Sequence, residues 1–283
     1  MKKILFPTDF SEVSNNAFIY ALKLADNLNA EVLVLHVYNL PYMQSDLQND
    51  GIPLNMMEVY DSIQLQNFEN LKDQIPILRD IATQYDLTHV KMSHVLKQGE
   101  LIWNINELVK EEGVEYIVMG TKGASGLKET FLGSTTASVI AEANVFVLGV
   151  PDTAEYKPIK NIVFTTRFRE KDIKAMKKLI QLAKTFDAKI HCLYVKTSKS
   201  DVKEETIEDW KMLFSHENVK FHIVEHDNVK DTILIFTEVK NIDLLAMLTE
   251  NRGFFEELFH QSLTQKVSYH VKIPILAIHE NKL

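Results

Sequence analysis

Three glycines and two hydroxyl side chains stand at fixed intervals in the stretch GTKGASGLKETFLGST. Gly120, Gly123 and Gly133 are three of the nine glycines in this 283-residue chain, and Ser134 and Thr135 follow the last of them. Glycine lets a backbone approach a phosphate closely, because it has no Cβ and tolerates positive φ. The free N–H groups at the start of a helix also attract anions. The stretch therefore predicts a phosphate-binding loop if a helix begins near its end.

Other reactive patterns are weaker. The glycine spacing is neither that of a Walker A loop nor that of the dinucleotide fingerprint. We find no Ser–His–Asp order and no Glu–His helix motif, so no general base can be named. The histidines lack metal-ligand spacing on a recognisable element. His36 lies in an apolar run, which favours a hydrogen-bonded core or sheet-end histidine over a catalyst.

The elements that would position the loop alternate between strands and helices. Runs such as VLVLHV and VFVLGV are almost wholly apolar and do not alternate, which is typical of parallel strands covered on both faces. Between them, apolar residues recur three or four apart, as in amphipathic helices. This order predicts a doubly wound α/β sheet. The strands of the first half are expected near 4–8, 31–38, 90–96, 116–120 and 145–150.

This order places the chemistry at one edge of the sheet. Gly120 ends the fourth strand, and Ser134 begins the last helix. Ligands bind at the carboxyl edge of such sheets, where the strand order reverses. Each residue also has a purely structural interpretation: Asp9 could cap the loop into the first helix, Ser134 could be an N-cap, and Gly123 could serve a turn. The loop 39–55 could cover a ligand or be a solvated excursion.

The chain repeats itself. The sequence from Lys2 aligns without a gap with the sequence from Lys160, through a strand, a helix and a second strand. A long internal period indicates two copies of one domain. We expect domains at 1–151 and 158–283, each a five-stranded parallel sheet of Rossmann-like type.

Composition limits the partners. The net charge is −8 and there is no basic stripe with interleaved aromatic residues, so nucleic acid is not an expected partner. No apolar run is long enough to span a membrane. The single cysteine, Cys192, lies in the apolar run IHCLYV and is expected to be a buried, inert thiol. These features predict a cytoplasmic protein.

The glycine stretch resembles the ATP-binding signature of the universal stress protein family: Gly, two residues, Gly, nine residues, Gly, then Ser or Thr. The stretches ILFPTDFSEVS and IVMGTKGASGL also resemble the family's opening strand and final third. The resemblance covers nearly the whole chain as a tandem of two domains. It departs at Val145, where the family often has proline.

The resemblance implies an adenine nucleotide, with ATP, ADP and AMP left open, and a Mg²⁺ ion could accompany its phosphates. By position, the end of the first strand would meet adenine and phosphate, Val37 would meet adenine through its backbone, and the end of the fourth strand would meet ribose. The glycines and hydroxyls would cradle the phosphates. The implied nucleotide-binding residues are Pro7, Thr8, Asp9, Val37, Met119, Gly120, Gly123, Gly133, Ser134 and Thr135.

The second copy lacks these residues. Leu248 stands opposite Gly120 and Arg167 opposite Asp9, and of the signature only Ser262 keeps its type. We therefore expect side chains to fill the corresponding space, and the second copy to act as a built-in dimerisation partner. Universal stress proteins often pair through their last strands, here the apolar VFVLGV and IPILAI. An apolar strand edge needs covering.

Three functions stay open. The first is a nucleotide-binding regulatory protein of the stress response. The second is an enzyme, such as a slow ATPase or an adenylyl transferase, which the missing general base disfavours. The third is an interaction module without a ligand. Any protein partner, and any homodimer beyond the internal pair, cannot be derived from the residues.

Overall fold

The structure is a computed structural model that describes residues 2–40, 54–121, 134–249 and 272–279. Ten strands form one sheet in the order β3-β2-β1-β4-β5-β10-β9-β6-β7-β8. Neighbouring strands within each group of five are parallel. The strands are β1 (Lys2–Pro7), β2 (Ala30–Tyr38), β3 (Met92–Gln98), β4 (Val114–Gly120), β5 (Phe146–Val150), β6 (Asn161–Thr165), β7 (Lys189–Lys196), β8 (Val219–Glu225), β9 (Leu244–Thr249) and β10 (Ile275–His279).

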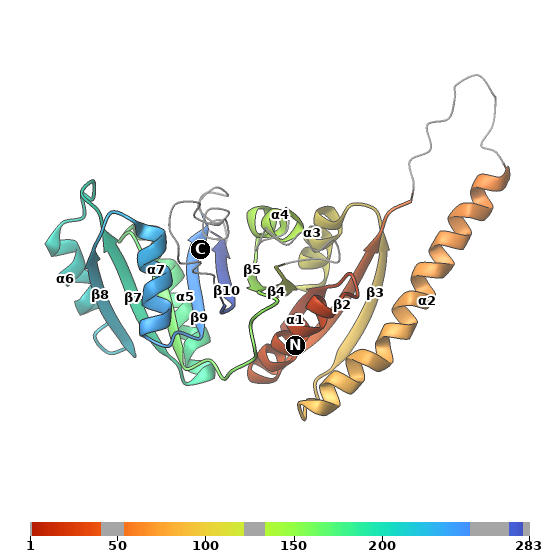
Figure 1. Ribbon diagram of the computed structural model, residues 1–283, viewed down its shortest axis with the longest axis horizontal. Helices are drawn as coiled ribbons and strands as arrows, with labels where there is room; N and C mark the ends of the chain where they lie inside the picture. The colour runs from red at the N-terminus through yellow and green to blue at the C-terminus, as the bar shows by residue number, and fades with distance from the viewer. Residues whose placement is uncertain (1, 41–53, 122–133, 250–271, 280–283) are drawn as a thin grey trace, which may run out of the picture.

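Seven helices in the described residues alternate with the strands (Figure 1). The doubly wound α/β prediction is confirmed. The helices are α1 (Glu12–Leu28), α2 (Leu54–Gln84), α3 (Leu101–Glu112), α4 (Ser134–Glu142), α5 (Glu170–Phe186), α6 (Glu204–Leu213) and α7 (Val229–Val239).

The two five-stranded groups join in the middle. β5 and β10 pair antiparallel, with Leu276 opposite Leu148, Ile275 opposite Gly149 and Ala277 opposite Val147. The expected antiparallel pairing of the two last strands is confirmed. The consequence is one continuous sheet rather than two separate ones. Hereafter, the first half is β1 to β5 with α1 to α4, and the second half is the remainder.

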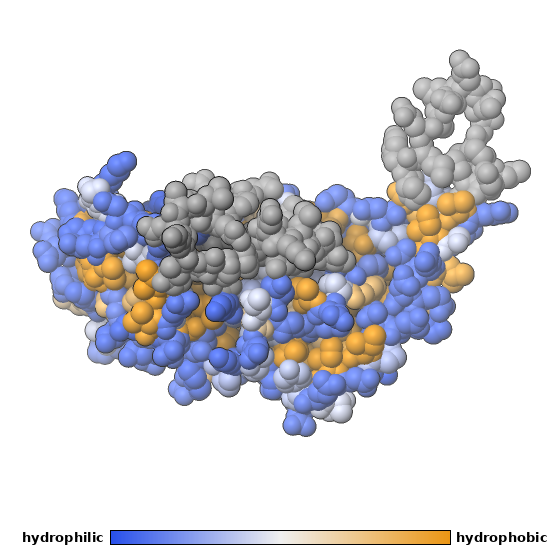
Figure 2. Space-filling model, viewed as in Figure 1, coloured by the Kyte–Doolittle hydropathy of each residue, from blue (hydrophilic) through white to orange (hydrophobic). Residues whose placement is uncertain are grey.

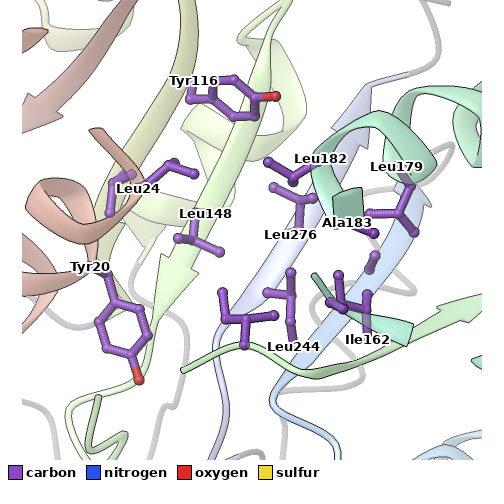
Figure 3. Packing of buried hydrophobic residues seen from close by; sticks show 14 of the residues in the cluster. Tyr20, Leu24, Tyr116, Leu148, Ile162, Leu179, Leu182, Ala183, Leu244 and Leu276 are labelled. Carbon is purple, nitrogen blue, oxygen red and sulfur yellow. The ribbon is translucent and has the colours of Figure 1, made fainter. Parts of the chain in front are cut away.

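A hydrophobic core runs through this joint. Figure 3 shows Leu24 and Leu148 of the first half beside Leu182 and Leu276 of the second, all of them buried. At its margin the Tyr20 hydroxyl donates to the Glu155 carbonyl at 3.0 Å, in the segment that connects the halves. The halves therefore share apolar packing as well as strand hydrogen bonds. Cys192 is buried in the same core, and burial raises the pKa of its thiol.

Local signals set the helix ends. The Ser11 hydroxyl accepts the Ser14 backbone N–H and caps α1, and Gly113 ends α3 with a φ of 64°. Asn29 and Asp187 end α1 and α5 at matching positions, with φ of 48° and 50°. The same loop geometry therefore recurs in both halves.

Helix α2 is the longest of the described helices. Its 31 residues continue through Pro76, and its beginning projects away from the sheet (Figure 1). Leu78 and Ala82 near its end are buried, whereas Leu65 and Phe68 are exposed. Of the expected loop 39–55, residues 41–53 lie outside the described residues. The face of the molecule shown in Figure 2 is largely hydrophilic, with scattered apolar patches. None of the described helices is long and apolar enough to cross a membrane.

Candidate functional site

The predicted site residues of the described strands meet at one edge. β1 lies between β2 and β4, and all three run parallel, so their carboxyl ends are adjacent. Pro7 ends β1, Val37 stands one residue before the end of β2, and Met119 and Gly120 end β4. The strand order reverses between β1 and β4, which is where α/β sheets open a crevice for ligands. The structure therefore brings these residues together as expected.

The turn after β1 is fixed by its own side chains. The Thr8 hydroxyl accepts the Phe10 backbone N–H at 3.0 Å and shares a hydrogen bond with the Ser14 hydroxyl at 2.7 Å. Phe10 has a φ of 62°. Exposed Asp9 accepts from the Ser11 N–H at 3.1 Å and from the Ser11 hydroxyl at 2.7 Å. Asp9 thus stabilises the loop into α1, which is the structural role considered for it in the sequence.

Both ring nitrogens of His36 have hydrogen-bond partners. Its Nδ1 lies 2.9 Å from the Thr8 carbonyl oxygen and its Nε2 lies 3.3 Å from the Asn67 Oδ1. Phe10 stacks on the ring, with centroids 4.3 Å apart. The prediction of a hydrogen-bonded sheet-end histidine is confirmed. Phe10 was missed because a phenylalanine after Asp9 carries no recognisable binding pattern.

The end of β4 is tied to the start of α4. The Thr136 hydroxyl, in the first turn of α4, donates to the Gly120 carbonyl at 2.8 Å. This contact keeps the helix N-terminus against the strand end. Helix α4 begins at Ser134, as predicted, and the Thr135 side chain is exposed.

Thr121 was also missed by the sequence analysis. It is 1% exposed, and its hydroxyl has no hydrogen-bond partner among the described residues. A buried hydroxyl without a partner is costly, so it is a candidate for a ligand contact. The sequence signal that could have identified Thr121 is its hydroxyl side chain directly after Gly120, which ends β4.

Part of the predicted phosphate cradle cannot be placed. Gly123 and Gly133 lie outside the described residues, as does the side chain of Ser134. Among the residues that are described, no group of three or more His, Cys, Asp or Glu side chains could hold a metal ion.

The second half has an open pocket at the matching edge. Its volume is about 540 Å³, and it lies at the ends of β6, β7 and β9, lined among others by Arg167 and Leu248. The expectation that side chains fill the phosphate-binding part of this space stays a prediction, because the residues opposite Gly123 and Gly133 lie outside the described residues. Larger residues replace Asp9 and Gly120, but the pocket persists around them because Arg167 is exposed and Leu248 is partly exposed.

Comparison with known proteins identifies the class. The family model for the universal stress protein family matches residues 1–151 and 201–279, so the chain belongs to that family. Universal stress protein MJ0577 of Methanocaldococcus jannaschii is 29% identical over 155 residues, which cover 53% of this chain and 94% of the relative. Universal stress protein YxiE of Bacillus subtilis is 31% identical over 137 residues, covering 48% and 90%.

The fold likeness extends over both halves. A universal stress protein crystal structure from Archaeoglobus fulgidus matches 98% of this chain and 98% of its own, with a TM-score of 0.70 and 18% identity. At that identity the likeness concerns the fold alone. Because it covers 98% of the chain, it includes both halves.

Proposed function

We propose that this chain is a cytoplasmic regulatory protein of the stress response that binds one adenine nucleotide in its first half. The observation that carries the proposal is the convergence of the β1, β2 and β4 ends beside the start of α4, at the switch point of the sheet. The domain limits 1–151 and 158–283 are part of the same proposal, with the second domain as built-in partner.

The residues at this edge fit such a ligand. Asp9 has carboxylate oxygens that could accept from the adenine amino group, in exchange for a bond to Ser11. The backbone at Val37 would meet the base, and Met119 and Gly120 the ribose. Thr121 supports the fit, because its buried hydroxyl has no other partner in the part of the chain that the structure describes. Gly123, Gly133 and the first turn of α4 would hold the phosphates, and a Mg²⁺ ion could bind with them.

A regulatory role is favoured over catalysis. His36, the one histidine near this edge in the described residues, is engaged with Thr8 and Asn67. It is therefore not available as a general base without rearrangement. Binding would instead alter the loops around the nucleotide and so the choice of partner.

Isothermal titration with ATP tests the proposal, and we expect one nucleotide per chain. Gly120→Leu copies the second half's own residue and should abolish binding, because a side chain would occupy the ribose position. The matched control is the reverse change, Leu248→Gly, which should leave ATP binding unchanged.

Several outcomes would contradict the proposal. Two nucleotides per chain, or binding that survives Gly120→Leu, would place the site elsewhere. No binding at all would favour an interaction module without a ligand. ADP or pyrophosphate released over hours in the presence of Mg²⁺ would favour the enzyme alternatives.

A further inference from the structure

The pocket of the second half has the size and walls of a small-molecule site. Its volume of about 540 Å³ falls within the range of roughly 300–1,000 Å³ that ligand pockets occupy. Its apolar walls come mainly from β7, β9 and α7, with Val202 added from the segment before α6. The apolar lining residues are Leu193, Val195, Val202, Val229, Ile233, Met247 and Leu248.

Three cationic side chains lie among the polar residues that line this pocket. Arg167 and Lys199 both line it and are exposed. Within the part of the chain that the structure describes, neither side chain takes part in a hydrogen bond or ion pair. Arg169 also lines the pocket, but its guanidinium contacts Asp172 at 3.1 Å. Among the described lining residues, Asp201 is the one carboxylate. Arg167 and Lys199 therefore give this part of the lining an excess of positive charge.

The backbone under Arg167 is held rigidly. Buried Asp172 accepts the Arg167 backbone N–H at 2.8 Å and the Thr166 hydroxyl at 2.9 Å. The same carboxylate oxygen also accepts the Arg169 backbone N–H, at 3.2 Å. Arg167 therefore starts from a fixed point at the pocket, and a guanidinium so placed can bind a carboxylate or phosphate through two parallel hydrogen bonds.

The residue at the Asp9 position disfavours the ligand expected in the first half. At the position of Asp9, which can accept from an amine, the second half presents Arg167, which only donates. An adenine amino group would find no acceptor on the Arg167 side chain, whereas the carboxylate of an acid would find a donor.

We propose that the second half binds an organic acid with an apolar body. Its carboxylate lies between Arg167 and Lys199, and its body lies against Val229, Ile233 and Met247. This site is independent of the nucleotide site, so the chain would carry two ligands of different chemistry.

Decanoate is a suitable probe, with decanol as its uncharged counterpart. Titration should show one decanoate per chain and much weaker binding of decanol. The double variant Arg167→Gln, Lys199→Gln should weaken decanoate binding by about tenfold or more, because charge-assisted hydrogen bonds are the strong ones. Lys110→Gln, in the last turn of α3, is the matched control and should change nothing.

The location can be read from methionine methyl resonances. Decanoate should shift the signal of Met247, which lines the pocket, and leave that of Met212, which is 76% exposed on α6. Three results would overturn the proposal: no binding at millimolar decanoate, equal binding of decanol, or decanoate displaced by ATP. Gly120→Leu should leave decanoate binding intact, which separates failure of this site from failure of the nucleotide site.

Discussion

After the first strand of each half, the chain makes the same turn with different side chains. Thr8 and Thr166 each accept the backbone N–H of the phenylalanine two residues on, at 3.0 and 2.8 Å. Phe10 and Phe168 have φ of 62° and 57°. The residue between the threonine and the phenylalanine, however, is Asp9 in the first half and Arg167 in the second.

The support beneath the turn differs as well. In the first half the Thr8 hydroxyl meets Ser14, whereas in the second half the Thr166 hydroxyl donates to Asp172, which is 1% exposed. Asp172 also binds two backbone N–H groups and Arg169. The comparison teaches that the backbone path can stay fixed while the residue between threonine and phenylalanine changes, because both turns keep the threonine–phenylalanine hydrogen bond.

The largest effect is expected where the halves meet. Leu276→Asp should lower the free energy of unfolding by more than about 4 kcal/mol, because it buries a charge in the shared core. Leu276 is 2% exposed and pairs with Leu148. Urea unfolding followed by Trp103 in the first half and Trp210 in the second, each as the only tryptophan, should show both transitions moving together.

Two variants control this measurement. Leu213→Asp, at a leucine 50% exposed on α6, should change the free energy of unfolding by less than about 0.5 kcal/mol. If Leu276→Asp does not fold, Leu276→Ala should cost about 2–5 kcal/mol. A shift seen by one tryptophan alone would mean that the halves unfold independently.

The supports under the two turns should differ in strength. Asp172→Ala should lower the free energy of unfolding by about 3 kcal/mol, since it leaves several buried donors and a guanidinium without their carboxylate. Ser14→Ala should cost about 1 kcal/mol, because it removes one neutral hydrogen bond. Equal losses in chemical unfolding would mean that the two turns are held in the same way.

A smaller effect is expected on the pH dependence of stability, and it arises in the second half. The rings of His191 on β7 and His222 on β8 lie side by side, with Nδ1 and Nε2 3.1 Å apart. Burial, and then the neighbouring His222 and lysines, lower the pKa of His191 to about 4. The unfolded chain binds this proton near pH 6.5, so the stability contribution is full above pH 6.5 and is lost as the pH falls toward 4.

The first half offers the matching residue. Leu33 stands at the position equivalent to His191 and is likewise buried. His191→Leu should therefore remove part of the stability loss between pH 6.5 and 4, on the order of 1–3 kcal/mol. Urea unfolding of both proteins at pH 7 and pH 4.5 measures the difference. Identical pH dependence in the two proteins would mean that His191 is not responsible.

The sequence predicted the elements well where burial is complete. The strand expected at 116–120 is observed as Val114–Gly120, and its residues are buried except for Glu115 and Gly120. The strand expected at 90–96 is observed as Met92–Gln98. β3 is an edge strand whose residues are mostly half-buried, so its polar and apolar residues mix and blur its ends.

The site was predicted less completely than the fold, because the sequence does not show where each side chain points. Strand ends follow from the chain order, so Pro7, Val37 and Gly120 could be placed at one edge. The pocket of the second half could not be predicted, because alignment reports that Leu248 is larger than glycine but not where it points. The isolated hydroxyl of Thr121 likewise depends on which groups surround it in space.

The pairing of β5 with β10 also decides how freely each half can change. Leu148 and Leu276 are counterparts in the two copies and face each other, so an approximate two-fold axis passes between them. In a dimer of identical chains, any substitution appears on both sides of such an axis, and a residue on the axis meets its own copy. In this single chain, Gly149 instead faces Ile275 while Val147 faces Ala277, so small and large residues complement each other across the axis. Covalent linkage therefore lets one half mutate without imposing the same change on the other.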